Sequence, residues 1–542
     1  MTELALLVGL ALCALVVVLF VAQRRRRFAL WESVRFAWGQ GRRTDREGRA
    51  LDAWPRRLDA VDDATWADLE MDRVFAWADR TLTALGAQTL YAWLRRPGEV
   101  TRRRALAERV AADDEARASA QTPLAALGDR VGWDAVSLAS RPLAPLPLPA
   151  WAYRAAVVGG LVFSVLALVL PSLLTILLAV ASVVLNAILH LRASSRIDGA
   201  MGSLRELASV VSTARLAHAA LDDEARDVFQ VGDAIRRASA VMAKGGVALR
   251  TPPGGDSYAE IPLEYARIFL LLDVRAYLRT AKALEAERGA VLDALRFLGE
   301  LDAALSLAHL VRHDAGLCAA TAISGPPRLE ARALAHPLLD GAVANDASLG
   351  PRGLLVTGSN MAGKSTFLRT LGVNALLAQT LGVARAQALR MTPLRVFASM
   401  GADDDLHASV SLYQAEVLRV RELLRASYDA PCLFLLDELF RGTNPRDRVA
   451  ASSAVLVELA RGHLVIAATH DLAVADFTEG AFALGHFSEE VDAERVTFDY
   501  RLRPGLSRGA NALALLSRFG FGAELVARAQ RIASLQARDD AA

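Results

Sequence analysis

Residues 358–365 of this 542-residue chain read Gly-Ser-Asn-Met-Ala-Gly-Lys-Ser and fit the pattern G-x-x-x-x-G-K-[ST] of a phosphate-binding loop (P-loop). The segment follows the apolar run GLLVT and precedes a helical pattern, which is the context that this motif requires. Glycines let backbone N–H groups curl around phosphates, and the N-terminus of the next helix adds its positive dipole end. The pattern therefore predicts a nucleoside triphosphate site.

Different residues of the predicted loop are expected to bind the phosphates and the metal ion. Lys364 is expected to reach the β- and γ-phosphates, and the Ser365 hydroxyl to ligate Mg²⁺, so we expect ATP and Mg²⁺ as cofactors. Lysine is scarce in this chain, which has only Lys244, Lys282 and Lys364, so a chance match to the motif is improbable. The predicted nucleotide-binding residues of the loop are Gly358, Ser359, Asn360, Met361, Ala362, Gly363, Lys364, Ser365 and Thr366.

Two later apolar runs end in side chains that suit hydrolysis. The run 432–438 (CLFLLDE) ends in Asp437, placed to hold Mg²⁺ through water, and Glu438, placed to polarise the attacking water as a general base. The run 465–470 (VIAATH) ends in His470, which can hydrogen-bond the γ-phosphate or the lytic water. The predicted catalytic residues are Glu438, His470 and Lys364, and the predicted metal ligands are Ser365 and Asp437.

The elements that must position these residues form an α/β pattern. Apolar runs at Leu354–Thr357, Cys432–Leu436 and Leu464–Ala468 alternate with helical stretches, which predicts a mostly parallel, doubly wound sheet. Upstream, Trp66–Ala120 and Ser203–Ala320 have the apolar spacing of helices. The expected fold is an α/β P-loop NTPase domain preceded by an α-helical region with transmembrane helices.

Two apolar blocks predict membrane segments. Leu4–Ala22 is uncharged, spans about 28 Å as a helix, and is followed by Arg24–Arg27, which the positive-inside rule places in the cytoplasm. Ala155–Leu191 has no Asp, Glu, Lys or Arg, and Pro171-Ser172 divides it, which predicts a helical hairpin. Three crossings leave the rest cytoplasmic, so we expect a multi-pass protein of a bacterial-type inner or plasma membrane. A single kinked membrane helix and a very apolar soluble hairpin are the alternatives for the second block.

Composition narrows the classes of function. Apolar residues make up 53% and charged residues 23%, which excludes wholesale disorder. The 62 Lys and Arg against 60 Asp and Glu give a net charge of +2, which provides no electrostatic argument for nucleic acid. Cys13, Cys318 and Cys432 lie far apart without metal-ligand spacing, so we expect no disulfide framework and a reducing compartment for the catalytic part.

Several motifs together resemble the ATPase domain of MutS-type DNA mismatch repair proteins. They are TGSNMAGKSTFLRTLG, LLDELFRGTN, ATH and the segment 403–416, which is similar to that family's signature segment. The resemblance implies that Asn360 helps to order the phosphates and that Ser411 crosses a dimer interface to the partner's γ-phosphate. It also implies an interfacial loop at Arg441–Thr443, a homodimer, and DNA as the default ligand. The tail 500–536 is similar to the family's C-terminal helix-turn-helix dimerisation element.

The chain also departs from that family. No Phe-x-Glu wedge occurs before the core region, and the apolar block 155–191 interrupts that region, so mismatch recognition in the family's usual manner is not expected. The signature Ser-Thr-Phe reads Ser-Leu-Tyr at 411–413. The aromatic residue that stacks on adenine in the family has no counterpart in Ala342–Leu349.

These observations predict six segments: an anchor at 1–27, helical core-like regions at 28–148 and 193–325, a transmembrane hairpin at 149–192, the ATPase domain at 326–499 and a dimerisation element at 500–542. The expected function is a membrane-anchored MutS-like ATPase that hydrolyses ATP at a dimer interface, with a DNA-related role implied by the resemblance alone. The alternatives are an ABC-type transport-related ATPase, although no Leu-Ser-Gly-Gly signature occurs, and a nucleotide-gated membrane scaffold with little hydrolysis.

Overall fold

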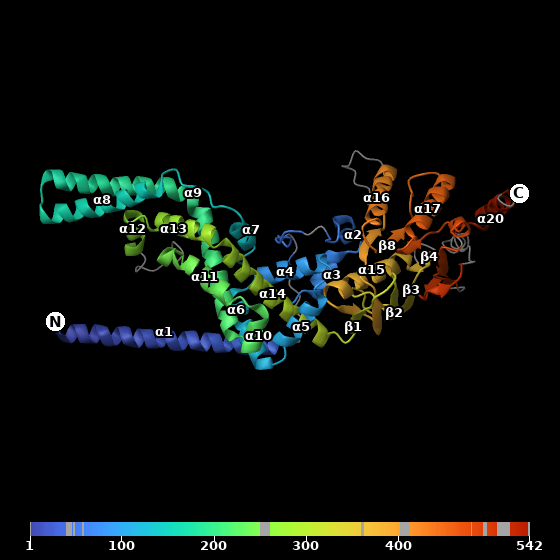
Figure 1. Ribbon diagram of the computed structural model, residues 1–542, viewed down its shortest axis with the longest axis horizontal. Helices are drawn as coiled ribbons and strands as arrows, with labels where there is room; N and C mark the ends of the chain where they lie inside the picture. The colour runs from blue at the N-terminus through green and yellow to red at the C-terminus, as the bar shows by residue number, and fades with distance from the viewer. Residues whose placement is uncertain are drawn as a thin grey trace. The chain divides into compact units, whose positions relative to one another are not determined.

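The computed structural model describes residues 2–38, 46, 49–56, 59–249, 261–358, 362–401, 412–478, 480–491, 496–506 and 521–539 (Figure 1). The chain divides into two units. The helical unit comprises Met1–Leu58 and Phe75–Asp314, and the sheet unit comprises Asp59–Val74 and Ala315–Ala542. These bounds differ from the predicted ones, because a short N-terminal segment joins the sheet unit and that unit begins before residue 326.

The helical unit is built from α-helices and one short 3₁₀ helix. Its elements are α1 (Thr2–Ala37), α4 (Ala84–Arg95), α5 (Val100–Val110), α6 (Asp114–Leu127), α7 (Ala135–Ser140), α8 (Ala150–Val169), α9 (Leu173–Ala220), α10 (Asp223–Phe229), α11 (Gly232–Ala243), η1 (Gly246–Leu249), α12 (Ile261–Phe269), α13 (Leu272–Ala286) and α14 (Arg288–His313). The helix α3 (Met71–Ala78) spans the boundary between the two units. The predicted helical character of this region is confirmed.

A buried carboxylate fastens α14 to the start of α4. Asp302 accepts hydrogen bonds from the backbone N–H of Leu82 at 3.0 Å, the N–H of Thr83 at 2.8 Å and the Thr83 hydroxyl at 2.6 Å. Thr83 is the N-cap of α4, and its Oγ1 also accepts from the N–H of Gly86 at 3.0 Å. A Cβ at Gly86 would lie 2.1 Å from Asp302 Oδ2, so only glycine lets the two helices approach this closely.

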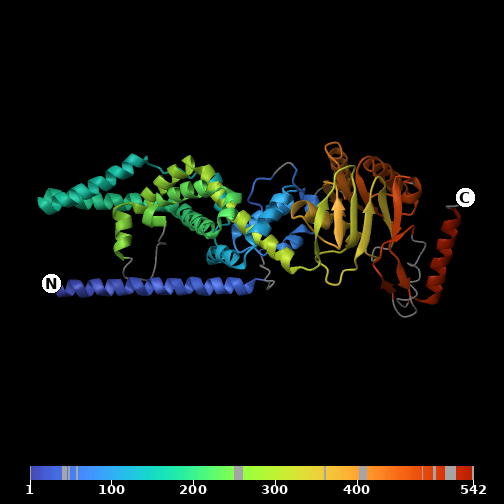
Figure 2. The same ribbon diagram turned by 60° about the horizontal axis from the view of Figure 1, so that its bottom comes forward.

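The predicted helical hairpin is present as α8 and α9. The turn at Pro171-Ser172 separates them, and Ser172 caps α9 through a reciprocal pair of hydrogen bonds with Thr175. Apolar side chains along both helices face outward; Leu168 is 84% exposed and Leu173 76% exposed. Figures 1 and 2 show that α1 and this hairpin project from the helical unit in the same direction. An apolar surface of this length is unusual for a helix pair in water.

The arginine cluster at 102–104 has structural contacts. Arg102 pairs with Glu300 of α14 at 2.6 Å, and Arg104 pairs with Glu108 at 3.2 Å. Arg103 is buried, donates to two backbone carbonyls and lies over the Trp93 ring, and burial lowers the pKa of its guanidinium to about 10. The cluster therefore contributes to helix packing in this unit.

The sheet unit contains a six-stranded sheet in the order β13-β10-β4-β9-β8-β7. Its strands are β4 (Gly353–Thr357), β7 (Arg395–Ser399), β8 (Cys432–Asp437), β9 (Leu464–Ala468), β10 (Phe482–His486) and β13 (Arg503–Pro504). All neighbours from β10 to β7 are parallel, and only β13 is antiparallel. Strands β8 and β9 are buried nearly throughout, which explains their continuous apolar runs. The predicted mostly parallel α/β sheet is confirmed.

A second sheet was not predicted. It has the order β3-β2-β6-β1-β5 and is mostly antiparallel. Its strands are β1 (Leu317–Ala322), β2 (Leu329–Leu334), β3 (Asn345–Leu349), β5 (Val383–Arg385) and β6 (Ala388–Met391). These strands are short and mix polar with apolar residues, so no apolar run marks them. The described residues also include a small hairpin of β11 (Glu489–Val491) and β12 (Val496–Phe498).

The helices of the sheet unit are α2 (Asp63–Asp68), α15 (Lys364–Thr380), α16 (Leu412–Ala426), α17 (Pro445–Leu459), α18 (Ala473–Phe477) and α20 (Ala523–Asp539). Helix α2 reaches this unit from the N-terminal half of the chain. The Thr65 hydroxyl accepts from the N–H of Ala398 in β7 at 3.0 Å and from Arg419 of α16 at 2.9 Å. The Asp68 carboxylate accepts from the N–H of Met400 at 3.0 Å. Of the predicted C-terminal element, α20 lies within the described residues, whereas 507–520 and 540–542 lie outside them.

Candidate nucleotide site

The two glycines at the ends of the loop between β4 and α15 have the conformations that a phosphate-binding loop uses. Gly358 (φ 135°) and Gly363 (φ 101°) both adopt left-handed conformations that other residues rarely take. A Cβ at Gly358 would also lie 2.7 Å from the carbonyl oxygen of Phe487, so space as well as conformation requires glycine there. Gly363 is the N-cap of α15, which aims the N-terminal end of that helix at the loop.

Lys364 begins α15 and folds back over the loop. Its side chain is only 1% exposed, and its Nζ donates to the carbonyl oxygen of Gly358 at 2.5 Å. Burial lowers the pKa of the Lys364 ammonium, while the negative charges of Glu438 and Asp437 oppose that shift. A buried ammonium at a helix N-terminus is suited to bind phosphate oxygens.

Ser365 and Asp437 meet although they lie 72 positions apart in sequence. The Ser365 hydroxyl donates directly to Asp437 Oδ2. Burial raises the pKa of Asp437, and the hydrogen bond from Ser365 opposes that rise. A hydroxyl and a carboxylate in contact supply the oxygen donors that Mg²⁺ prefers, so these two predicted metal ligands fit that ion.

Glu438 and His470 form the second predicted pair. His470 Nδ1 lies 3.0 Å from Glu438 Oε1, with the Glu438 side chain largely buried and His470 46% exposed. Glu438 adopts a left-handed conformation (φ 50°), and its N–H donates to the carbonyl oxygen of Ala468 at the end of β9, at 3.0 Å. The ends of β8 and β9 thereby bring a carboxylate and an imidazole together beside the loop.

The remaining predicted residues divide into described and undescribed positions. Ala362, within the loop, is buried, and Thr366 is exposed on α15. The backbone N–H groups of Arg441 and Gly442 donate to Glu416 of α16 at 3.3 and 3.4 Å, so α16 holds the loop predicted to be interfacial. Ser359, Asn360, Met361 and Ser411 lie outside the described residues.

Residues 354–536 match the family described as MutS domain V. This chain contains a MutS domain V. Over that region the chain is similar to proteins of the MutS family, which confirms the resemblance of the motifs. The matched residues include β4 from Leu354 onward, the phosphate loop, β8 and β9, so the described site residues Gly358, Lys364, Ser365, Asp437, Glu438 and His470 lie inside the matched region.

Several curated proteins are similar to this region of the chain. Endonuclease MutS2 of Thermus thermophilus is 34% identical over 236 residues, which cover 42% of this chain and 32% of that protein. Endonuclease MutS2 of Thermomicrobium roseum is 34% identical over 213 residues, 38% of this chain and 27% of that protein. DNA mismatch repair protein MutS of Thermus thermophilus is 32% identical over 277 residues, 50% of this chain and 32% of that protein. The chain thus spans about a third or less of the length of these relatives.

The MutS domain places an aromatic residue beside the loop that the sequence did not predict. A Cβ on Gly363 would lie 3.1 Å from Cδ1 of Tyr500, so the tyrosine ring packs against the end of the loop. Asn345 fixes this tyrosine, because its side chain donates to the Tyr500 carbonyl at 2.9 Å and accepts from the N–H of Leu502 at 2.8 Å. The segment 342–349 contains no aromatic residue, but its Asn345 holds the backbone of Tyr500.

A second unpredicted contact stabilises the strand end that carries His470. Arg448 of α17 makes two hydrogen bonds to the neighbouring Asp471, at 2.7 and 3.1 Å. The N–H of Asp471 donates to Thr469 Oγ1 at 3.0 Å, and the N–H of Thr469 donates to the Val356 carbonyl of β4. The turn after β9 is thereby tied to both α17 and the strand that leads into the loop.

Proposed function

We propose that the MutS domain of this chain binds ATP with Mg²⁺ and hydrolyses it. The observation that carries the proposal is the contact between Ser365 at the start of α15 and Asp437 at the end of β8. This contact brings the phosphate loop and the acidic end of β8 together, and a nucleotide with its metal must bind to both. The buried Lys364, which precedes Ser365 in α15, supplies the positive charge. The relatives found give no support to the transporter or to the scaffold alternative.

Each residue has a role in the proposed reaction. The Lys364 ammonium exchanges the Gly358 carbonyl for phosphate oxygens, and Ser365 and Asp437 hold the metal. Mg²⁺, when bound, neutralises phosphate charge. Glu438 accepts the proton of the attacking water, and the hydrogen bond to His470 fixes the orientation of that carboxylate. We further propose that a second copy of the chain supplies Ser411 across the nucleotide and that Tyr500 stacks on the base.

Substitution of Lys364 tests the nucleotide site directly. The variant Lys364→Ala is expected to bind ATP about ten- to a hundredfold more weakly than wild type, because it loses a charge-assisted hydrogen bond to phosphate. Lys282→Ala is the matched control, since Lys282 lies on α13 in the helical unit. Equilibrium binding of radiolabelled ATP by the full chain in magnesium buffer measures the difference. Equal retention of ATP by Lys364→Ala and the control would contradict the proposal.

We also propose that the helical unit is anchored in a membrane. Two helices, Ala150–Val169 and Leu173–Ala220, are long and apolar enough to span a bilayer. In the most apolar 18-residue stretch of each helix, only 17% and 11% of the residues, respectively, are buried. The shared direction of α1 and the hairpin supports insertion into one bilayer (Figure 2). The arginines that follow both apolar blocks support a cytoplasmic MutS domain.

The membrane proposal predicts the behaviour of two double variants. Val162 and Val180 are exposed and lie near the middle of the two hairpin arms. In the double variant Val162→Arg with Val180→Arg, each arginine is expected to raise the free energy of inserting the hairpin into the bilayer by about 2.5–3.5 kcal/mol. The variant protein should therefore be depleted from membranes. Val228→Arg with Val311→Arg, at exposed apolar positions elsewhere in the unit, is the control. Alkaline extraction of cell membranes is the measurement. Release of the wild-type chain into the soluble fraction would refute the anchor.

The names of the relatives indicate DNA as the ligand to test. They include proteins named as endonucleases and as DNA mismatch repair proteins, and we propose that this chain also acts on DNA. The ATPase rate of the full chain with and without duplex DNA, mismatched DNA and liposomes tests this role. Stimulation by liposomes alone would argue against it.

A further inference from the structure

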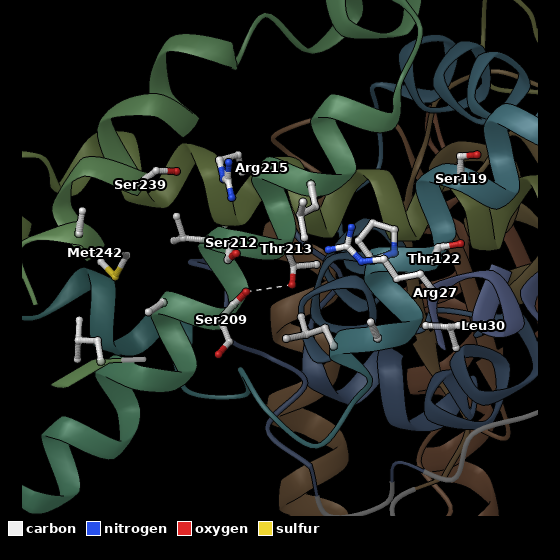
Figure 3. A pocket seen from close by; sticks show the side chains of 18 residues that line it. Arg27, Leu30, Ser119, Thr122, Ser209, Ser212, Thr213, Arg215, Ser239 and Met242 are labelled. Carbon is white, nitrogen blue, oxygen red and sulfur yellow. Dashed lines mark hydrogen bonds between the residues drawn. The ribbon is translucent and has the colours of Figure 1, made fainter. Parts of the chain in front are cut away.

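A pocket of about 910 Å³ lies within the helical unit, between α1, α6, α9 and α11 (Figure 3). Its volume falls in the range of small-molecule sites, which is roughly 300–1,000 Å³. Hydroxyl groups from three of the helices line it, among them Ser119, Thr122, Ser212 and Ser239. The pocket is unrelated to the nucleotide site, which belongs to the other unit.

The charge of the pocket is positive. Arg27 of α1 and Arg215 of α9 line it, and none of its 18 lining residues is acidic. Figure 3 shows the Arg27 side chain extending from α1 into the pocket. Neither arginine forms an ion pair with any residue in the described part of the chain. Among the described residues, two guanidinium groups without acidic partners therefore face the same space, which favours an anionic ligand.

The pocket also has unused hydrogen-bonding capacity and an apolar part. The Ser239 hydroxyl is buried and makes no hydrogen bond within the described residues, so it has a donor to offer to a ligand. Leu30, Met242 and Leu249 line the pocket beside these polar groups. A ligand that satisfies both parts has an anionic group attached to an apolar body.

The position of Arg27 in the chain identifies a source for such a ligand. Arg27 follows Ala22, the last residue of the apolar run of α1, by five residues, or roughly 8 Å along a helix. The headgroup layer of a bilayer extends about 5–8 Å beyond each side of the hydrocarbon core. If α1 spans the bilayer, Arg27 lies at the depth of the lipid phosphates.

We propose that this pocket binds the headgroup phosphate of an anionic phospholipid. The Arg27 and Arg215 guanidinium groups contact the phosphate, the Ser239 hydroxyl donates to a headgroup oxygen, and the start of an acyl chain lies against the apolar side chains. The assignment rests on the proposed membrane attachment of the helical unit. It adds a specific lipid contact to an anchor that otherwise needs only apolar surface.

Short-chain phospholipids test the pocket separately from insertion into a bilayer. The full chain in neutral detergent is titrated with dihexanoyl phosphatidylglycerol, dihexanoyl phosphatidylcholine and glycerol phosphate, and bound lipid is counted by native mass spectrometry. We expect one phosphatidylglycerol per chain, bound about tenfold more tightly than either other compound. Arg27→Gln and Arg215→Gln should each weaken that binding by about tenfold. Both arginines are exposed, so these variants should fold.

The control variant is Arg24→Gln, which lies on the same helix and does not line the pocket. It should bind phosphatidylglycerol like wild type. Equal binding by Arg27→Gln, Arg215→Gln and the control would overturn the proposal. Glycerol phosphate bound as tightly as phosphatidylglycerol would also overturn it, because the ligand would then be a free phosphate compound. Membrane extraction reports separately on the anchor, so failure of one proposal is distinguishable from failure of the other.

Discussion

Glu438→Gln is expected to slow ATP hydrolysis by about 10²–10⁴-fold, the usual range for loss of a general base. ATP binding should stay close to that of wild type, because Lys364 and the loop glycines remain in place. The amide of glutamine keeps the size and the hydrogen-bonding reach of the carboxylate toward His470, which lies 3.0 Å away. The substitution therefore removes the proton acceptor while preserving the packing around it.

The measurement pairs a steady-state phosphate-release assay with equilibrium ATP binding on the full chain. Glu458→Gln is the matched control: Glu458 lies on α17 in a solvent-exposed pair with Arg461, and its loss should leave both quantities unchanged. Similar hydrolysis rates for Glu438→Gln and Glu458→Gln would remove Glu438 from the catalytic assignment. A loss of binding in Glu438→Gln would indicate a structural role instead.

Asp302→Ala is expected to lower the free energy of unfolding of the helical unit by about 2–4 kcal/mol. The variant leaves two backbone N–H groups and the Thr83 hydroxyl buried without their acceptor. Urea unfolding followed by the fluorescence of buried tryptophans of this unit, such as Trp77 and Trp93, measures the change. Asp293→Ala, which removes an exposed acid on the same helix, is the control and should change stability by under about 0.5 kcal/mol.

The difference between wild type and Asp302→Ala should depend on pH. Burial raises the pKa of Asp302 from 3.8 to about 6, so the folded chain binds this proton more tightly than the unfolded chain. The resulting stabilisation is complete below about pH 4 and is lost as the pH rises through 6. The stability gap to Asp302→Ala should consequently be wider at pH 5 than at pH 7.5. A gap that narrows toward pH 5 would contradict the raised pKa.

The sequence was sufficient to predict an element of the fold wherever an apolar run or a fixed motif marked that element. Strands β4, β8 and β9 are buried nearly throughout, so their composition alone marked them as strands. The helical hairpin was predicted from its uninterrupted apolar block and the Pro171-Ser172 break. In each case a local pattern reports directly on burial or on a turn.

Contacts between distant segments were not predictable in this way. Tyr500 lies beside the phosphate loop, and its backbone carbonyl accepts a hydrogen bond from Asn345, which lies 155 positions earlier. Helix α2 has an ordinary polar N-cap and a short apolar stretch, and nothing in it indicates that Thr65 bonds to β7 and α16. The strands of the second sheet are short and have mixed polarity, and their pairing depends on partners that sequence spacing does not reveal.

The early segment Asp59–Val74 has a consequence for how the protein matures. Because the polypeptide enters the sheet unit, leaves it and returns at Ala315, three covalent crossings join the two units. During synthesis, α2 emerges from the ribosome more than 300 residues before β7 and α16, with which it shares hydrogen bonds. The sheet unit therefore cannot fold to completion from its last-translated portion alone, and a fragment that starts at Ala315 would lack α2 and its hydrogen bonds to β7 and α16.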